Sequence, residues 1–271
     1  LVTPRSEDEV AAVVSTCEAG GVPWRVLGLG SNVLAPDEGL DGVTLLLADN
    51  FADVEVLPGG LVRAAAGATN AAVAAVARDT GLAGYEFASG IPGTVGGAAI
   101  MNAGAYDGTT GEVLESVRVY VPSKHGNRGS VVTLEARDLN LGYRKSRVHD
   151  DGLIVISATF KLSPASEGMI RAAMDDYQRR REEKQPLEMA SAGSTFKRPE
   201  GYFAGKLIMD AGLRGARVGD AQVSEKHCGF VVNTGRASAK DVLGLIEHVQ
   251  SEVKSRFGVD LEPEVRMIGE F

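Results

Sequence analysis

The spacing of apolar and polar residues predicts a small α/β lobe at the N-terminus. The stretch Ser6-Glu7-Asp8-Glu9 has the pattern of a capping box and precedes an apolar periodicity, which predicts a helix through Ala19 that ends at Gly20-Gly21. The apolar stretches 24–28 and 43–47 then predict two strands. We therefore expect residues 1–50 to form one unit of mixed structure.

From residue 53 the pattern is typical of an α+β lobe. A strand, the turn Pro58-Gly59-Gly60 and a strand through Ala66 precede an alanine-rich helix at 69–80. Further strands are predicted at 117–121, 130–134 and 153–162. A long charged helix at 169–184 ends before Gln185-Pro186, where proline stops a helix, so we place a domain boundary between 51–184 and the rest.

The third region, 185–258, is predicted to contain a short helix at 203–211, a strand at 230–233 and a long helix that Ser238 caps. Five apolar residues lie on one face of this long helix, a spacing more often found in a core than at a partner site: Val242, Ile246, Val249, Val253 and Phe257. The segment 259–271 completes the chain.

Two glycine-dense segments, 25–34 and 90–105, suggest a ligand. Both remove Cβ atoms where the main chain could approach an anion and donate several N–H groups to it. Together they predict a diphosphate-bearing cofactor that is held mainly by main chain. The alternative that the glycines serve only tight turns stays open, more so for 28–32 than for the longer second segment.

Two common nucleotide-binding motifs fit these glycines poorly. A dinucleotide fingerprint needs a third glycine where Val33 stands, and no long helical pattern follows Leu34. A P-loop needs a lysine before its Ser or Thr, and neither segment contains a lysine. These observations argue against a Rossmann dehydrogenase and against an NTPase.

The composition narrows the classes of partner. A chain of 271 residues that is 44% hydrophobic can bury a large core and has room for two domains. Its net charge of −8 argues against nucleic acid as the main ligand. No apolar run has the length of a membrane span and no signal peptide is recognised, so we expect a cytoplasmic location.

Cysteine and histidine give no sign of a metal site. Cys17 and Cys228 are isolated and are expected to be buried thiols. The four histidines include no His-x-x-x-His pair: His125, His149, His227 and His248. Because the sequence begins at Leu1 without a methionine, we expect a preceding segment whose contribution the sequence does not give.

Six stretches in a fixed order resemble the UDP-N-acetylenolpyruvoylglucosamine reductase family. They are 25–34, 90–104, Tyr143-Arg144-Lys145-Ser146, 192–199, 219–227 and 261–268. The resemblance implies a vanillyl-alcohol-oxidase-type FAD-binding fold of class α+β. It implies two FAD-binding subdomains, 1–50 and 51–184, an α/β substrate-binding domain at 185–258, and a C-terminal strand at 259–271 that brings Glu264 to the active site.

The same resemblance implies a function in peptidoglycan precursor synthesis. It implies that non-covalent FAD, reduced by the co-substrate NADPH, reduces UDP-N-acetylglucosamine enolpyruvate to UDP-N-acetylmuramate. No histidine or cysteine lies in either glycine segment, which argues against a covalent flavin link. By position in the motifs, Arg144 and Glu264 resemble the charge-stabilising pair and Ser194 the proton donor.

The motifs also assign binding residues. Those expected at FAD are Leu27, Gly28, Leu29, Gly30, Ser31, Asn32, Gly90, Ile91, Pro92, Gly93, Thr94, Gly96, Gly97, Ala98, Asn102, Gly104, Ala105, Ile154 and Ile156. Those expected at the substrate are Tyr143, Lys184, Lys197, Arg198, Lys206 and Gln222. The sugar nucleotide and NADPH both carry phosphates. We therefore expect the cationic members of this set, together with Arg217 and Lys226, to gather around those phosphates.

Several positions depart from the family pattern. Leu29 replaces a glycine, Arg198 replaces an asparagine, and Met209 stands where an acidic residue is usual. No insertion carries a substrate-clamping tyrosine, so the chain resembles the loop-lacking second type. Two alternatives stay open: a flavin-dependent hydroxy-acid oxidase or dehydrogenase on the same fold, and a non-catalytic flavin or nucleotide-sugar binding protein.

Overall fold

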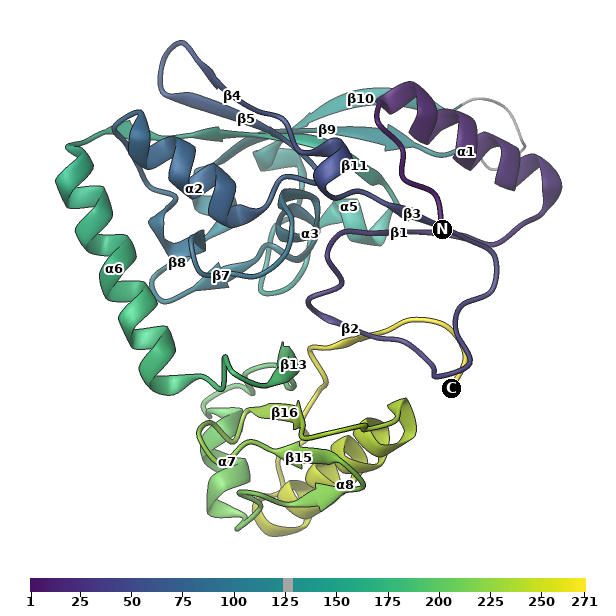
Figure 1. Ribbon diagram of the computed structural model, residues 1–271, viewed down its shortest axis with the longest axis vertical. Helices are drawn as coiled ribbons and strands as arrows, with labels where there is room; N and C mark the ends of the chain where they lie inside the picture. Colours follow the sequence, from purple (N-terminus) through teal and green to yellow (C-terminus); the bar gives the residue numbers. More distant parts are fainter. Residues whose placement is uncertain (124–128) are drawn as a thin grey trace. The chain divides into compact units, whose positions relative to one another are not determined.

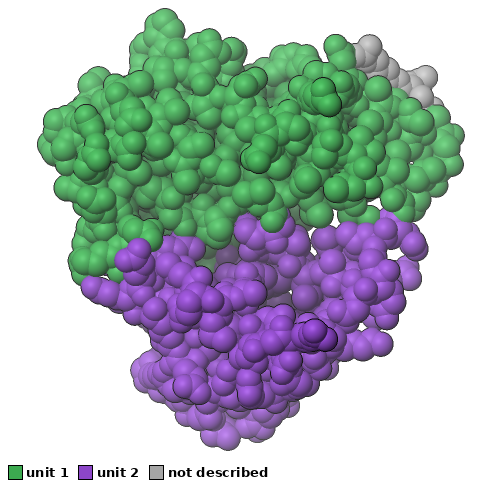
Figure 2. Space-filling model, viewed as in Figure 1, with its two compact units in different colours: residues 1–29, 42–179 green, residues 30–41, 180–271 purple. Residues whose placement is uncertain are grey.

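The computed structural model describes residues 1–123 and 129–271, so His125 lies outside the described residues. The chain divides into two compact units, coloured separately in Figure 2. Unit 1 comprises Leu1–Leu29 and Gly42–Arg179, and unit 2 comprises Gly30–Asp41 and Arg180–Phe271. Packing therefore divides the first glycine segment between the units, whereas the functional division at residues 50, 184 and 258 stays a prediction.

The N-terminal part of unit 1 has the predicted helix and strands. Helix α1 (Glu7–Gly20) begins at the cap Ser6, whose hydroxyl accepts the Glu9 N–H at 3.2 Å, and ends at left-handed Gly21. The Glu9 carboxylate accepts the Arg5 N–H instead of completing a capping box on Ser6. Strands β1 (Trp24–Leu27) and β3 (Val43–Leu46) pair in parallel, and the short helix η1 (Asp49–Phe51) follows them.

A five-stranded antiparallel sheet forms the centre of unit 1. Its order is β10 (Ser130–Glu135), β9 (Leu114–Val121), β11 (Ile154–Lys161), β5 (Leu61–Ala65) and β4 (Val54–Leu57). Buried side chains alternate with less buried ones along β5, whereas β9 and β11 bury consecutive residues. Val117, Val62 and Phe160 are fully buried in the resulting core. This sheet confirms the strands that the sequence predicts between residues 53 and 162.

Figure 1 shows α2 (Asn70–Asp79), α3 (Val95–Met101) and α5 (Arg147–Asp150) on one face of this sheet. Helix α2 confirms the alanine-rich helix. The long charged helix is α6 (Glu167–Lys184). The shorter elements are β6 (Leu82–Ala83) with β12 (Ser163–Pro164), β7 (Gly104–Ala105) with β8 (Gly108–Thr109), α4 (Thr110–Val113), η2 (Glu86–Ala88) and η3 (Ala136–Asp138).

Unit 2 contains a second, four-stranded sheet. Its order is β13 (Ala190–Ser194), β16 (Phe230–Asn233), β15 (Ala221–Val223) and β14 (Arg217–Val218). Buried side chains of helices α7 (Ala204–Asp210) and α8 (Ala239–Phe257) form one hydrophobic core with those of this sheet. Strand β2 (Val33–Leu34) pairs in parallel with β17 (Arg266–Met267). Ser238 caps α8 as predicted, and Ile246, Val249 and Val253 are buried, whereas Phe257 at the helix end is 40% exposed.

Within the described ranges, 1–123 and 129–271, no helix has both the length and the apolar composition that a membrane span requires. The same residues contain no group of three or more His, Cys, Asp or Glu side chains arranged to hold a metal ion.

Candidate active site

The first and second glycine segments meet in unit 1 at Gly28 and Thr94. A Cβ atom built on Gly28 would overlap the Thr94 hydroxyl oxygen and would lie 3.0 Å from Thr94 Cγ2. A larger residue at position 28 would therefore push the two segments apart. The missing Cβ atom of Gly28 thus lets the first segment lie against the Thr94 side chain of the second, which fits the prediction that both segments take part in holding a diphosphate-bearing cofactor.

The second glycine segment forms helix α3, which the sequence analysis did not predict. The hydroxyl of its cap, Thr94, accepts the Gly97 N–H at 3.5 Å, and the Gly96 N–H donates to the Ala66 carbonyl at 2.8 Å. A Cβ atom on Gly96 would lie 3.1 Å from both Cβ and O of Ala66. Because Gly96 has no side chain, α3 can pack against Ala66, the residue that follows β5. The Gly96 N–H bonds to protein main chain, whereas we expected it to contact an anion. Contacts of Gly96, Gly97 and Ala98 with FAD stay predictions.

The loop that precedes α3 is held by a buried asparagine that the sequence analysis missed. Asn70, which is 1% exposed, donates from Nδ2 to the carbonyl oxygens of Ile91 and Gly93 at 3.4 and 3.5 Å. The Tyr85 hydroxyl donates to Asn70 Oδ1 at 2.9 Å. Burial raises the pKa of Tyr85, which keeps the hydroxyl protonated and available as a donor.

The other expected FAD contacts lie in different surroundings. Leu27 ends β1, and Leu29 is 52% exposed beside Gly28. Ile154 and Ile156 belong to the buried core of unit 1 on β11, and Gly104 and Ala105 form β7. Gly30, Ser31 and Asn32 belong to unit 2. Their contacts with FAD also stay predictions.

Arg144 lies in a tight turn of unit 1. Gly142 and Lys145 exchange backbone hydrogen bonds at 3.0 and 3.3 Å, and Arg144 between them has the left-handed φ of 56°. This conformation costs a residue with a Cβ atom about 1–2 kcal/mol. The Arg144 guanidinium lies 5.0 Å from the centre of the Tyr143 ring, which is itself 57% exposed, and its Nη2 is 3.5 Å from the Gly104 carbonyl. Arg144 is thus half-buried beside β7, at a strained position of the kind often found at functional sites.

Unit 2 brings Ser194 and Glu264 onto adjacent segments. The Glu264 N–H donates to the Thr195 carbonyl at 2.8 Å, and Phe196 forms a β-bridge with Pro263. Ser194 is exposed at the end of β13, and Glu264 is half-buried. Residues far apart in sequence are therefore joined by main-chain hydrogen bonds. Two of the three predicted catalytic residues share this region, and Arg144 belongs to the other unit.

Comparison with known proteins identifies the family. The model of FAD binding domains matches residues 1–126, and the model of the UDP-N-acetylenolpyruvoylglucosamine reductase C-terminal domain matches residues 185–268. The UDP-N-acetylenolpyruvoylglucosamine reductase of Agathobacter rectalis is 50% identical over 97% of this chain and 85% of its own length. The enzyme of the same name from Clostridium novyi is 49% identical over 100% of this chain and 86% of its own length. The chain belongs to the UDP-N-acetylenolpyruvoylglucosamine reductase family.

A solved structure of the same family confirms the fold. The crystal structure of the reductase from Thermus caldophilus matches with a TM-score of 0.80 at 36% identity and covers 98% of this chain and 90% of that chain. The FAD-binding fold of class α+β with a C-terminal reductase domain is therefore confirmed. Membership of the reductase family decides against the hydroxy-acid oxidase alternative.

The expected substrate-binding residues of this reductase family member are mostly engaged with neighbours in unit 2. The Lys206 amine contacts the Asp210 carboxylate at 2.6 Å, and Gln222 Nε2 donates to the Gly215 carbonyl at 3.3 Å. The other contacts are Lys197 with Glu262, Arg217 with Thr234, Lys226 with the Glu182 carbonyl, and Arg198 over the Phe203 ring at 4.0 Å. All of these cations belong to one unit, as does Lys184 at the end of α6. Their gathering around substrate phosphates stays a prediction.

His227 is a half-buried titratable group in the same unit. Its Nδ1 accepts the Gly229 N–H at 3.1 Å, and its ring packs edge-on against Phe230 at 5.1 Å. Burial lowers the pKa of His227, and the positive charge of Lys184 lowers it further. The Gly229 carbonyl accepts the Thr195 N–H at 2.8 Å, so this neutral imidazole supports the chain beside Ser194.

Proposed function

We propose that this chain reduces UDP-N-acetylglucosamine enolpyruvate to UDP-N-acetylmuramate in the bacterial cytoplasm, as a step of peptidoglycan precursor synthesis. Non-covalent FAD supplies the hydride when bound and is reduced by NADPH. Relatives that are named UDP-N-acetylenolpyruvoylglucosamine reductase and match the whole chain support this function. The net charge of −8 supports the absence of a nucleic-acid partner.

Three side chains are proposed to act on the enolpyruvyl group of the substrate, each in a different role. When hydride reaches the terminal vinyl carbon, negative charge develops on the α-carbon and the carboxylate. The Arg144 guanidinium, a permanent cation with several donors, binds this charge. Glu264, the second member of the proposed charge-stabilising pair, acts as a hydrogen-bond donor, because an anionic carboxylate would repel the developing charge. The Ser194 hydroxyl gives its proton to the α-carbon. Because a serine hydroxyl is a weak acid, the reaction requires charged groups near Ser194 to assist the transfer.

The observation that carries this assignment is the hydrogen bond from the Glu264 N–H to the Thr195 carbonyl at 2.8 Å. It joins the segments that carry Ser194, the proposed acid, and Glu264. The arrangement supports a catalytic role over the alternative of a binding protein without turnover.

Replacing Glu264 tests the assignment. Glu264→Ala retains the main-chain bond to Thr195 and loses only the carboxylate, so NADPH should still reduce the flavin at the wild-type rate. Reoxidation by the enolpyruvyl substrate, measured by anaerobic stopped-flow absorbance, should slow by about 100- to 1,000-fold, the usual effect of removing one group that stabilises developing charge.

Glu262→Ala provides the matched control. This carboxylate lies two positions earlier on the same segment, is exposed and pairs with Lys197. Its loss removes a surface ion pair worth about 0–1 kcal/mol, and reoxidation should stay within a few-fold of wild type. Equal rates for the two variants would contradict the role of Glu264.

A further inference from the structure

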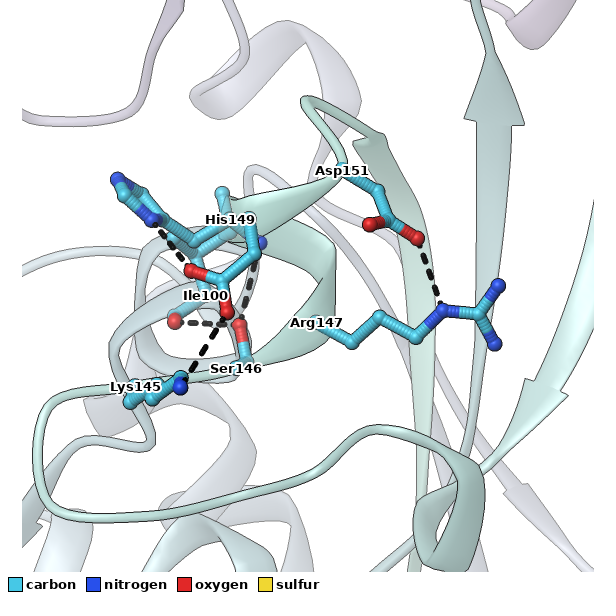
Figure 3. Close-up of polar contacts among 7 residues, drawn as sticks. Ile100, Lys145, Ser146, Arg147, His149 and Asp151 are labelled. Carbon is cyan, nitrogen blue, oxygen red and sulfur yellow. Dashed lines mark hydrogen bonds and ion pairs between the residues drawn. The ribbon is translucent and has the colours of Figure 1, made fainter.

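The residues just before and just after Arg144, here called the two stems of its turn, are both hydrogen-bonded to the C-terminal end of helix α3. The stem after Arg144 reaches Ser146, which is 0% exposed and whose hydroxyl donates to the Ile100 carbonyl at 2.7 Å. The same oxygen accepts the His149 N–H at 3.3 Å and caps α5. Figure 3 shows this hydroxyl between the two partners. Ser146 thus links the turn, α5 and α3 in one buried position.

The stem before Arg144 is fastened by Asn102, the left-handed cap of α3. Its Nδ2 donates to the Gly142 carbonyl at 3.0 Å, and its Oδ1 accepts the Gly111 N–H at 2.8 Å. The motif resemblance placed Asn102 among FAD contacts. In the structure both ends of its amide are engaged with protein main chain, one of them with the Arg144 turn.

Other polar contacts near the turn are exposed and hold it less firmly. The Lys145 amine lies 3.7 Å from the Asp150 carboxylate, and Arg147 lies 2.8 Å from Asp151 (Figure 3). All four side chains are more than 40% exposed, and exposed ion pairs of this kind contribute little. Ser146 and Asn102 therefore supply side-chain bonds that link the turn to the end of α3, beside the main-chain bond from the Arg147 N–H to the Leu139 carbonyl at 2.7 Å.

We propose that Ser146 and Asn102 are positioning residues of the reductase reaction. From the end of α3 they hold both stems of the 142–145 turn and so fix the place of the Arg144 guanidinium. This proposal rests on the charge-stabilising role proposed for Arg144. A misplacement of about 1 Å in such a group is enough to cost on the order of 100-fold in rate.

A double-mutant cycle tests the proposal on the FAD-loaded enzyme. Ser146→Ala should leave FAD content and reduction by NADPH near wild type and should slow reoxidation by the enolpyruvyl substrate by about 10- to 100-fold. In an Arg144→Ala background, the same change should slow reoxidation further by less than about twofold, because the group that Ser146 positions is already absent. Amide hydrogen exchange of residues 142–146, measured by mass spectrometry, should become faster in Ser146→Ala.

Two further variants separate positioning from folding. Asn102→Asp is isosteric and keeps the acceptor for the Gly111 N–H, but it loses the donor to the Gly142 carbonyl, so it should slow reoxidation in the same coupled way. Ser6→Ala removes another cap hydroxyl of unit 1, at α1, and should leave both half-reactions and exchange at 142–146 unchanged.

The positioning role is overturned if Ser146→Ala and Asn102→Asp reoxidise within twofold of the wild-type rate. It is also overturned if Ser146→Ala slows reoxidation by the same factor in the Arg144→Ala background as in the wild-type enzyme. If Ser146→Ala does not retain FAD, the reoxidation rate of Asn102→Asp alone tests the positioning role. If Arg144→Ala itself reoxidises at the wild-type rate, the function proposed for Arg144 fails, and the positioning proposal fails with it.

Discussion

Arg144 in unit 1 and the Ser194–Glu264 pair in unit 2 are positioned by different kinds of hydrogen bond. The Arg144 turn is linked to helix α3 by two side chains, Ser146 and Asn102, through bonds with main-chain carbonyls. The segments of Ser194 and Glu264 are joined to each other through main chain, by the bond from the Glu264 N–H to the Thr195 carbonyl. Side chains hold their flanks, because Asn32 Nδ2 donates to the Glu264 carbonyl at 3.2 Å and the Thr195 hydroxyl accepts the Val231 N–H at 2.9 Å. A side-chain substitution can therefore remove a link between the Arg144 turn and α3, whereas the bond between the segments of the pair is retained when a side chain is changed.

The two regions also differ in strain. Arg144 has a φ of 56°, whereas Ser194 is not among the residues with a positive φ. Its strand β13 shifts register on β16 between Ser191 and Ser194, and the left-handed φ there, 80°, belongs to Gly193, which adopts it at little cost. A residue held in the left-handed region persists only where its surroundings impose it. The buried anchors of the Arg144 turn supply that constraint, so the side chains that fix the guanidinium also offset the backbone strain.

The largest effect that separates the regions is expected for Arg144→Gly. Relief of about 1–2 kcal/mol of backbone strain exceeds the entropic cost of glycine, about 0.5–1 kcal/mol, so the variant should be as stable as wild type or slightly more stable. Its reoxidation by substrate should slow by about 100- to 1,000-fold, because a cation is lost from the developing charge. Denaturant titration and stopped-flow absorbance measure the two quantities.

Asn140→Gly is the control for Arg144→Gly. Asn140 also has a left-handed φ, 47°, and is exposed in the same unit. Its replacement should change stability by less than about 1 kcal/mol and leave turnover unchanged. A large loss of stability in Arg144→Gly would show that the arginine side chain, and not its anchors, holds the turn.

A smaller effect is expected from protonation of His227 in unit 2. The pKa of this half-buried imidazole is lowered in the folded state, so above the unfolded pKa of about 6.5 its contribution to stability is complete. As the pH falls below that value, the unfolded chain takes up a proton that the folded chain resists, and stability falls until the pH has passed the folded pKa. Protonation also removes the Nδ1 acceptor of the Gly229 N–H.

Thermal unfolding between about pH 7.5 and pH 5 checks this prediction. Wild-type Tm should fall towards acid pH, and His227→Asn, which carries no titrating group, should show a shallower fall. His248→Asn, on the exposed face of α8, is the control and should keep the wild-type profile. An identical profile for His227→Asn and wild type would contradict a role for His227 in supporting the chain beside Ser194.

Elements with strong local signals could be predicted from the sequence. The Ser6 and Ser238 caps, the alanine-rich α2 and the charged α6 have their own periodicity and end signals, and the structure has them within a few residues. The Pro58-Gly59-Gly60 turn likewise predicted the β4–β5 hairpin. The motifs pointed to the family, which the full-length relatives confirm.

The other features of the fold and of the candidate site depend on tertiary contacts, which a local sequence pattern does not predict. Helix α3 contains Gly96 and Gly97, which are poor helix formers, and it is stabilised by packing on Ala66. Asn70 lies outside the six family stretches, and Ser146 lies inside one that gives no sign of its role. The partners of these side chains, the main-chain carbonyls of Ile91 and Ile100, belong to distant segments. The division of the first glycine segment between two units was equally invisible in sequence.

The central claim is that Ser194 acts only after hydride has left the flavin, and Ser194→Ala tests it most directly. Anaerobic stopped-flow absorbance follows flavin reduction by NADPH and then reoxidation by the enolpyruvyl substrate in the same variant. Ser191→Ala, an exposed serine at the other end of β13, serves as the control and should match wild type in both steps. Ser194→Ala should bind FAD and be reduced at the wild-type rate but reoxidise about 100- to 10,000-fold more slowly. Reoxidation within a few-fold of wild type would show that Ser194 is not the acid.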